Sequence, residues 1–320
     1  MTEDIELKNS DHDFSHKHLL GLADYSREDI LYVLEQAKYF REILDRPVPK
    51  VPTLRDKTIV NLFYEDSTRT RLSFELAQKR MGADVVNFSK GSSSVKKGES
   101  LKDTIRNISS MKIDMVVTRH SSPGVPHFLT RCVDAAIINA GDGAHEHPTQ
   151  ALLDMFTMQQ VYPDLSGKNI AIIGDIAHSR VVRSNIIGLL KLGANVTVCG
   201  PKTMMPAYVD ELGVNVSYHL EEVLDWCDIA MALRIQLERQ EDGTELFPSI
   251  REYHQLFGIT MKHLEKYSNF TIMHPGPVNR GVEMESEVAD SDRSIILSQV
   301  TNGVAVRMAI LYLLSGGSRV

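Results

Sequence analysis

Short apolar segments that favour β-strands alternate along this chain with longer segments of helical periodicity, and the alternation starts a second time midway. The first series has expected strands at 58–63, 85–88, 115–118 and 136–139 and expected helices at 71–81 and 101–111. After a helix expected over 149–162, the second series has strands at 169–173, 196–199, 214–218, 229–233 and 270–274, a helix at 181–192 and a closing helix at 300–314. Strands separated by helices form parallel sheets through right-handed crossovers. The pattern therefore predicts an α/β protein with two doubly wound parallel-sheet domains joined by helices.

The length of 320 residues agrees with two domains, since domains average about 150 residues. We place the first domain at 1–148, completed by a C-terminal helix at 298–320, and the second domain at 149–297. A hydrophobic fraction of 42% and a charged fraction of 24% are typical of globular chains and exclude a wholly disordered one. The net charge of −7 argues against a nucleic-acid partner, which needs a basic face, but allows a local pocket for a small anion.

Cysteine usage and hydropathy indicate where the protein works. Cys132, Cys199 and Cys227 are widely spaced and form no C-x-x-C pair, which argues against disulfides and favours a reducing compartment. We interpret all three as buried, inert residues. No apolar run approaches the ~20 residues of a membrane span, and the polar N-terminus lacks the apolar core of a signal peptide. The sequence thus predicts a cytoplasmic protein without a membrane partner.

The residues that follow the expected strands are rich in Arg, Lys, His, Ser and Thr. In an open parallel sheet, ligands bind beyond the carboxyl ends of the strands, so these loops predict an anion site at one edge. Residues 67–71, Ser-Thr-Arg-Thr-Arg, lie between a strand and a helix, where backbone N–H groups and the helix dipole favour phosphate. An equally good alternative is that Ser67 only caps the helix and the arginines are solvated. No P-loop motif occurs, and Gly-Asp-Gly at 141–143 lacks the third glycine of a dinucleotide fingerprint.

Two groups of histidines resemble metal ligands at first sight. His12, His16 and His18 fall in a polar N-terminal stretch of about 17 residues, which we interpret as a solvated tail. His145 and His147 flank a glutamate, but their spacing is not that of H-E-x-x-H, so we interpret them as hydrogen-bonding residues. We therefore expect no metal, and no cofactor.

Taken together, the loop motifs resemble the carbamoyltransferase family. The resemblance rests on Ser-Thr-Arg-Thr-Arg followed by Leu-Ser-Phe-Glu, then Lys-Lys-Gly-Glu-Ser, then His-Pro-Thr-Gln. The second half, with Gly-Asp at 174–175, Ser-Arg at 179–180 and Leu-Arg-Ile-Gln at 233–236, is similar to the catalytic chains that use L-aspartate. The likeness covers the chain from about Asp24 onward. Ornithine-specific members typically carry His-Cys-Leu-Pro where residues 274–277 read His-Pro-Gly-Pro, although ornithine or another amino acid stays an alternative acceptor.

The resemblance implies transfer of the carbamoyl group from carbamoyl phosphate to the amine of L-aspartate, in de novo pyrimidine (UMP) biosynthesis. The implied carbamoyl phosphate ligands are Ser67, Thr68, Arg69, Thr70, Ser93, Lys97, Arg119, His147 and Gln150. The implied aspartate ligands are Lys97, Arg180, Arg234, Gln236, Gly276 and Pro277. The implied catalytic residues are Arg69, Thr70, Lys97, Arg119 and His147.

The resemblance also implies a homotrimer with shared active sites, in which Ser93 and Lys97 reach into the site of the neighbouring subunit. A larger assembly with regulatory or dihydroorotase chains is left open. The charged segment 236–243 follows the implied aspartate ligands, and we interpret it as a loop that closes over the site.

Overall fold

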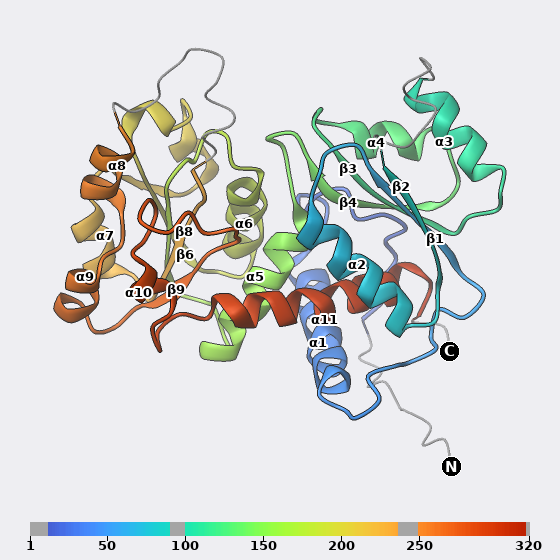
Figure 1. Cartoon of the computed structure of the whole chain (residues 1–320), viewed down its shortest axis with the longest axis horizontal. Helices are drawn as coiled ribbons and strands as arrows, with labels where there is room; N and C mark the ends of the chain where they lie inside the picture. The colour runs from blue at the N-terminus through green and yellow to red at the C-terminus, as the bar shows by residue number, and fades with distance from the viewer. Residues whose placement is uncertain (1–11, 90–99, 236–248, 318–320) are drawn as a thin grey trace. The chain divides into compact units, whose positions relative to one another are not determined.

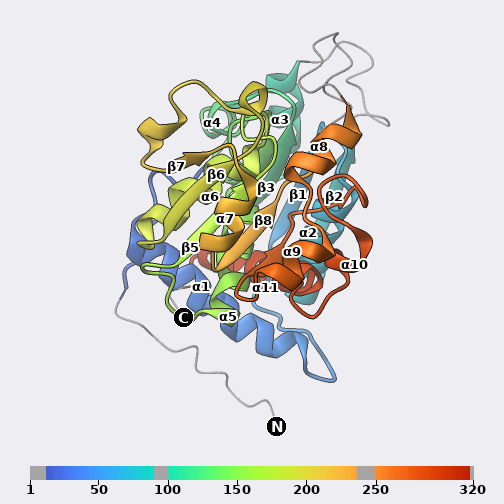
Figure 2. The same ribbon diagram turned by 90° about the vertical axis from the view of Figure 1, so that its left-hand side faces the viewer.

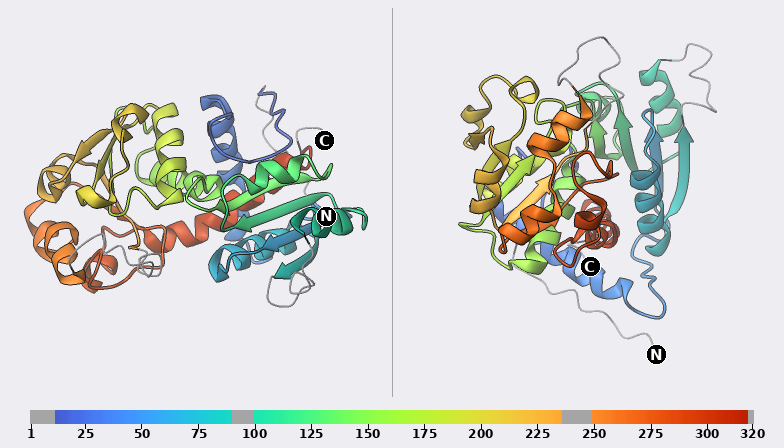
Figure 3. Two further views of the ribbon diagram at one scale, coloured as in Figure 1. Left: turned by 90° about the horizontal axis from the view of Figure 1, so that it is seen from above. Right: turned by 60° about the vertical axis from the view of Figure 1, so that its left-hand side comes forward.

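The computed structural model describes residues 12–89, 100–235 and 249–317. The predicted site residues Ser93, Lys97 and Gln236 lie outside these ranges, as does the predicted closing loop at 236–243. The chain divides into two compact units: unit 1 is Met1–Phe156 with Thr301–Val320, and unit 2 is Thr157–Val300. The chain passes from one unit to the other within helices α5 (Pro148–Val161) and α11 (Ile296–Leu314), which Figure 3 shows in green and red. The domain limits at 148/149 and 297/298 stay predictions.

Unit 1 contains a four-stranded parallel sheet, sheet A, in the order β2-β1-β3-β4. Its strands are β1 (Thr58–Phe63), β2 (Asp84–Ser89), β3 (Met115–His120) and β4 (Ala136–Asp142). Its further helices are α1 (Arg27–Leu44), α2 (Thr68–Arg80), α3 (Leu101–Ser109) and α4 (Val125–Thr130). Figure 1 shows α2 on one face of the sheet and α3 and α4 on the other. Right-handed crossovers require this, because the chain moves one way from β1 to β2 and the opposite way afterwards.

Sheet A is covered on both faces, so its strands consist largely of apolar residues without strict alternation. Val60 and Leu62 belong to a core cluster with Ile105 of α3 and residues of α4. On the opposite side, the ring of Tyr312 in α11 lies 5.8 Å from Phe40 in α1. By length and composition α11 could cross a membrane, but 72% of its apolar window is buried inside the protein, as in the core helix of a globular domain.

The N-terminal stretch from residue 12 onward packs against unit 1, so the predicted solvated tail is wrong for these residues. The Nε2 atoms of His12 and His16 lie 2.8 and 3.0 Å from the two carboxylate oxygens of Asp29 at the start of α1. Phe14 is buried, and Leu19 forms a parallel bridge to β4 at the edge of sheet A. A polar sequence is ordered here because one buried carboxylate accepts hydrogen bonds from both imidazoles.

Unit 2 contains a five-stranded parallel sheet, sheet B, in the order β7-β6-β5-β8-β9. Its strands are β5 (Asn169–Ile173), β6 (Asn195–Cys199), β7 (Asn215–Ser217), β8 (Ile229–Ala232) and β9 (Thr271–Met273). Its helices are α6 (Arg180–Lys191), α7 (Leu220–Trp226), α8 (Ile250–Phe257), α9 (Met261–Lys266) and α10 (Ser286–Ala289), with 3-10 turns η3 (Lys202–Met204) and η4 (Val209–Leu212). Figure 2 shows β5, β6 and β8 running in the same direction, and Figure 1 shows α6 on the face opposite α7, α8 and α9.

The predicted fold class, two parallel-sheet α/β domains, is confirmed. Helix α2 begins at Thr68, three residues before the predicted start, so the Ser-Thr-Arg-Thr motif supplies its first turn. Helices α4 and α7 to α10 were not predicted, because they are too short to show a helical period. Cys199 and Cys227 are buried as predicted, whereas the prediction is wrong for Cys132, which is only half-buried.

Candidate active site

The first turn of α2 lies beyond the carboxyl end of β1. Ser67 is the N-cap residue, with extended backbone angles (φ −158°, ψ 94°), and its side chain makes no capping hydrogen bond. The alternative in which the Ser67 side chain caps the helix is therefore wrong. Thr70 is buried, whereas Thr68 and Arg69 are exposed. Because the first N–H groups of a helix have no acceptor within the helix, this turn presents donors for an anion.

Arg119 lies at the end of β3, where the pairing with β4 shifts register between Thr118 and His120. Its Nη2 donates to Glu65 Oε1 at 2.7 Å, and its Nη1 donates to the carbonyl oxygen of Ala140 at 3.2 Å. The guanidinium is thus held between the loop after β1 and the end of β4, with only 11% of the side chain exposed. A local shift in register re-aims a side chain, which explains how a strand residue reaches the edge of the sheet.

The loop between β4 and α5 is built on two buried carboxylates. Asp142 Oδ1 accepts the backbone N–H of Glu146 at 3.1 Å and the side-chain amide of Asn139 at 2.9 Å. Glu146 Oε2 accepts the backbone N–H of Leu22 at 3.0 Å. His147, at the end of this loop, is buried, and its ring lies next to α5. Hydrogen bonds within the loop, together with the one from Leu22, therefore hold its conformation.

The two histidines of this loop have hydrogen-bonding contacts, as predicted. His145 Nδ1 lies 3.1 Å from Asp142 Oδ2, and His147 Nδ1 lies 3.4 Å from Thr149 Oγ1. Within residues 12–89, 100–235 and 249–317, no cluster of His, Cys, Asp and Glu has the arrangement of a metal site.

Arg307 of α11 is a buried arginine that interacts electrostatically with predicted site residues of unit 1. Gln150 Nε2 donates to Asp154 Oδ1 at 2.9 Å, and the charge of Asp154 acts on Arg307. Burial lowers the pKa of Arg307 to about 10; Asp154 opposes this shift, and the positive charges of Arg119 and Arg69 add to it. The charges of Arg69, Arg119 and Asp154, the last of which is hydrogen-bonded to Gln150, therefore all act on the guanidinium of Arg307. Sequence reasoning missed Arg307, although a single charge inside an apolar helix was a usable signal.

In unit 2 the predicted aspartate ligands follow three neighbouring strands. Strand β5 pairs with β8 and β8 with β9, so the segments after them meet at the carboxyl edge of sheet B. Arg180 begins α6 after β5 and is buried, Arg234 follows β8 and is half-buried, and Gly276 and Pro277 follow β9. The structure thus brings these four residues to one edge of one sheet.

Glu283 holds the segment that carries Arg234. Its Oε1 accepts the backbone N–H of Ile235 at 2.8 Å, and its Oε2 accepts the backbone N–H of Asn279 at 2.8 Å. Burial raises the pKa of Glu283 above its usual range, although these N–H groups partly oppose the shift. The side-chain amide of Asn279 donates to the carbonyl oxygen of Ile235 at 3.1 Å, which joins the loops after β8 and β9. Neither Glu283 nor Glu65 was predicted, because their roles depend on contacts between distant segments.

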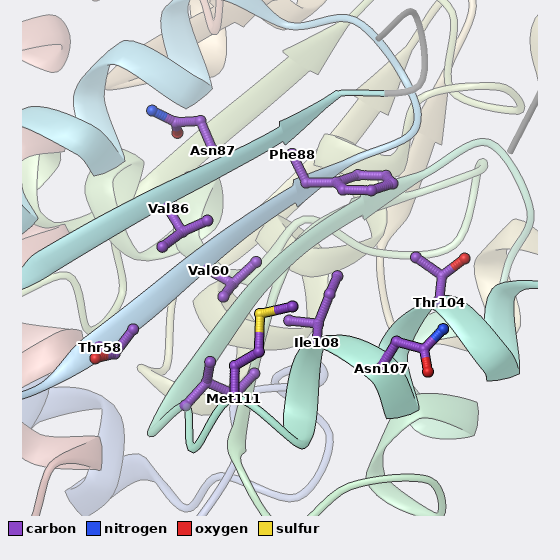
Figure 4. Close-up of a pocket in the computed structure, with 10 residues that line it drawn as sticks. Thr58, Val60, Val86, Asn87, Phe88, Thr104, Asn107, Ile108 and Met111 are labelled. Carbon is purple, nitrogen blue, oxygen red and sulfur yellow. The ribbon is translucent and has the colours of Figure 1, made fainter. Parts of the chain in front are cut away.

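Unit 1 also has an apolar cavity of about 380 Å³ beside edge strand β2. Figure 4 shows Val60, Val86 and Phe88 from the sheet facing Ile108 and Met111 from the α3 side. It lies against the face of the sheet, not at its carboxyl edge, and none of the predicted site residues within the described ranges lines it. The cavity is therefore separate from the site described above.

Two family models match the chain in sequence order. The one described as the carbamoyl-P binding domain of aspartate/ornithine carbamoyltransferase matches residues 17–160. The one described as the Asp/Orn binding domain of the same family matches residues 166–314.

Individual relatives agree with the family models over nearly the whole chain. An aspartate carbamoyltransferase catalytic subunit from Cytophaga hutchinsonii is 58% identical over 94% of this chain and 97% of its own length. The structure of aspartate transcarbamoylase from Trypanosoma cruzi, in complex with carbamoyl aspartate and phosphate, is 31% identical, with a TM-score of 0.83 over 92% of this chain and 95% of that one. Ornithine carbamoyltransferase from Pyrococcus furiosus is 27% identical, with a TM-score of 0.81 over 94% and 97%. The backbone resembles both kinds of enzyme, whereas the sequence is more similar to the aspartate proteins.

Proposed function

The chain belongs to the aspartate/ornithine carbamoyltransferase family, and we infer that it transfers the carbamoyl group of carbamoyl phosphate to the amine of L-aspartate, giving N-carbamoyl-L-aspartate and phosphate. The observation that carries this function is that one unit has an anion site at the carboxyl edge of sheet A, whereas the other unit has two arginines at the carboxyl edge of sheet B. L-Aspartate is favoured over ornithine because it has two carboxylates, which Arg180 and Arg234 suit, and because the relatives with the higher identities use that name.

The phosphate group binds at the start of α2 in this proposal. The backbone N–H groups of Ser67 to Thr70 and the helix dipole favour a dianion, and the Arg69 guanidinium adds a full positive charge. The Ser67, Thr68 and Thr70 hydroxyls complete the set of donors. Lys97 and Ser93, which lie outside the described residues, add further donors by resemblance to the family.

The carbamoyl oxygen receives hydrogen bonds from Arg119, Thr70 and His147, with Gln150 contacting the carbamoyl group. The Glu65 carboxylate and the Ala140 carbonyl hold the Arg119 guanidinium in place, so it needs little reorganisation when charge develops. The amine nitrogen attacks the carbamoyl carbon, and the new C–N bond replaces the C–O bond to phosphate. The bonding pair leaves with phosphate, whose oxygen also takes the proton that the amine loses. Orientation and electrostatic stabilisation supply the catalysis, without a side-chain nucleophile.

L-Aspartate binds through unit 2 in this proposal. Arg180 and Arg234 each pair with one carboxylate, Gln236 and Lys97 assist, and the carbonyl oxygens of Gly276 and Pro277 accept from the amine. Glu283 and Asn279 support the Arg234 segment. Since one substrate is held by each unit, the reaction requires both half-sites.

Carbamoyl transfer to candidate acceptors tests this function. We expect labelled carbamoyl phosphate to carbamoylate L-aspartate, with slow release of phosphate when no acceptor is present. Arg234→Lys, which lacks the planar fork of arginine, should raise the KM for aspartate at least about tenfold, since a charged hydrogen bond contributes roughly 1.5–3 kcal/mol. Preferential use of ornithine, or normal aspartate kinetics in Arg234→Lys, would contradict the assignment.

We also propose that the enzyme is a homotrimer with shared sites, to which Ser93 and Lys97 come from the neighbouring subunit. The test is to mix Lys97→Ala and His147→Ala subunits, each nearly inactive alone, after dissociation. About three quarters of random trimers are mixed, and each mixed trimer regains one site in three, so about a quarter of wild-type activity should return. If Lys97 acts within its own chain, mixing restores nothing.

The cellular setting follows from the reaction. We propose that the enzyme acts in pyrimidine biosynthesis, since N-carbamoyl-L-aspartate already contains the atoms of a pyrimidine ring. We also propose that it is located in the cytoplasm, since the three cysteines of the protein are unpaired. Regulatory or dihydroorotase partners stay open, and size-exclusion chromatography of the native enzyme from its source distinguishes a free trimer from a larger assembly.

A further inference from the structure

Arg307 is a buried charged residue that the mechanism above does not use. It lies on α11 among apolar neighbours and is only 3% exposed. Its Nη1 donates to Ser73 Oγ and to the carbonyl oxygen of Gly303, both at 2.9 Å. The guanidinium lies 5.0 Å above the ring of Phe74, a contact that favours a cation.

These contacts connect α11 to the phosphate-binding turn. Ser73 and Phe74 lie one turn after Thr70 on α2, so Arg307 contacts this helix directly after its first turn. A displacement of this helix start would move the N–H groups and hydroxyls that face the phosphate. Arg307 is therefore placed to fix the geometry of the phosphate site without touching the phosphate.

The charges around Arg307 act on it in opposite directions. Arg69 and Arg119 add positive charge to its surroundings, while Asp154 is the carboxylate that acts on it directly. The carboxylate of Glu65 pairs with Arg119, one of these two arginines. A buried cation is costly unless it is compensated, and its Nε makes no hydrogen bond in the structure. A dianion bound at the start of α2 would add to the compensation that Asp154 supplies.

We propose that Arg307 is a positioning residue for carbamoyl phosphate, which orients the start of α2 and adds positive potential to the phosphate site. This inference rests on the proposed function. An apolar side chain of similar length would fill the same space, so packing alone does not explain why a charge is kept there. If Arg307 only braced the fold, its loss would lower stability and active fraction without changing the affinity for one substrate selectively.

The test compares Arg307→Met, Arg307→Lys and Ser73→Ala with wild type. Arg307→Met keeps the stem and removes the charge, whereas Ser73→Ala keeps the charge and removes the contact to α2. Arg280→Met, which removes an exposed arginine of unit 2 paired with Asp290, is the matched control. The measurements are the Kd of inorganic phosphate by calorimetry, the KM of each substrate, and the midpoint of thermal unfolding.

We expect Arg307→Met to raise the phosphate Kd and the carbamoyl phosphate KM at least tenfold, with the aspartate KM changed less than twofold. Arg307→Lys should recover part of the phosphate affinity, and Ser73→Ala should weaken it severalfold while its unfolding midpoint stays near that of wild type. Arg280→Met should bind phosphate normally. Phosphate binding unchanged in Arg307→Lys and Ser73→Ala would overturn the proposal, even if Arg307→Met does not fold.

The two hypotheses fail in different ways. If wild type binds phosphate but transfers no carbamoyl group to any acceptor, the proposed function fails while the role of Arg307 in anion binding is still measured. If wild type is active and the Arg307 variants bind phosphate normally, or lose affinity for both substrates equally, the inference about Arg307 is wrong.

Discussion

Gly21 lies against the buried carboxylate of Glu146, and adding one methyl group there should impair both stability and catalysis. A Cβ at position 21 would overlap Glu146 Oε1 and lie 2.8 Å from Glu146 Cδ, closer than real Cβ atoms approach, and it would lie 3.0 Å from Oε2. Gly21 is not among the glycines with left-handed backbone, so an alanine there has no conformational conflict of its own. The whole cost of Gly21→Ala therefore comes from displacing Glu146.

The structure sets the size of this cost. Glu146 is 3% exposed, and its Oε2 accepts the backbone N–H of Leu22, so the carboxylate has little room to move. Losing a hydrogen bond to a buried charged group costs about 1.5–3 kcal/mol, and we expect the free energy of unfolding to fall by that amount. His147 is the next residue along the loop. A shift of about 1 Å at a catalytic group lowers rates by up to about a hundredfold, so kcat should fall between tenfold and a hundredfold.

A double-mutant cycle isolates this contact. Urea unfolding and kcat are measured for wild type, Gly21→Ala, Glu146→Asp and the double variant. The shorter aspartate leaves room for the new methyl, so Gly21→Ala should cost at least about 1 kcal/mol less in the Glu146→Asp background. Gly167→Ala, where no heavy atom lies within 4 Å of the added Cβ but the backbone is left-handed (φ 71°), is the contrasting substitution, since its cost comes from backbone strain and should not depend on residue 146. Additive effects of the two changes, within about 0.5 kcal/mol, would refute the reasoning.

Three further predictions follow from contacts in the two half-sites. Glu283→Ala should raise the KM for aspartate at least about tenfold while leaving the KM for carbamoyl phosphate unchanged, because it frees the Arg234 segment; steady-state kinetics with each substrate varied decides this. Arg119→Lys should lower kcat by about 10²–10³-fold in a folded protein, since lysine cannot bridge Glu65 and a carbonyl; circular dichroism controls for folding, and near-normal kcat would remove Arg119 from the oxyanion role. Burial lowers the pKa of His18, whose Nδ1 accepts a backbone N–H, so the unfolded chain binds more protons than the folded one. The free energy of unfolding should therefore fall as pH drops below about 6.5. His18→Asn, which keeps the acceptor, should reduce this pH dependence of the free energy of unfolding, measured in urea titrations.

The sequence by itself determined the class of fold and the edges at which ligands bind. Apolar periodicity is a local property, so strands such as Thr58–Phe63 and Asn169–Ile173 were predicted with the bounds that the structure has. The rule that parallel sheets bind ligands at the carboxyl ends of their strands then directed attention to Ser67–Thr70, Arg119 and Arg234. The individual site residues came from the resemblance of the short loop motifs to the carbamoyltransferase family.

Only the tertiary structure decided which side chains support these residues. Leu22 and Glu146 are 124 positions apart, and Ser73 and Arg307 are 234 apart, yet each pair shares a hydrogen bond. The order of residues along one chain contains no distances between such segments. A carboxylate such as Glu146 therefore looks the same in sequence whether it is solvated or buried against a backbone N–H. Burial makes the difference, because it turns an ordinary charge into a group that must be paired, and pairing of that kind is set by how the chain folds back on itself.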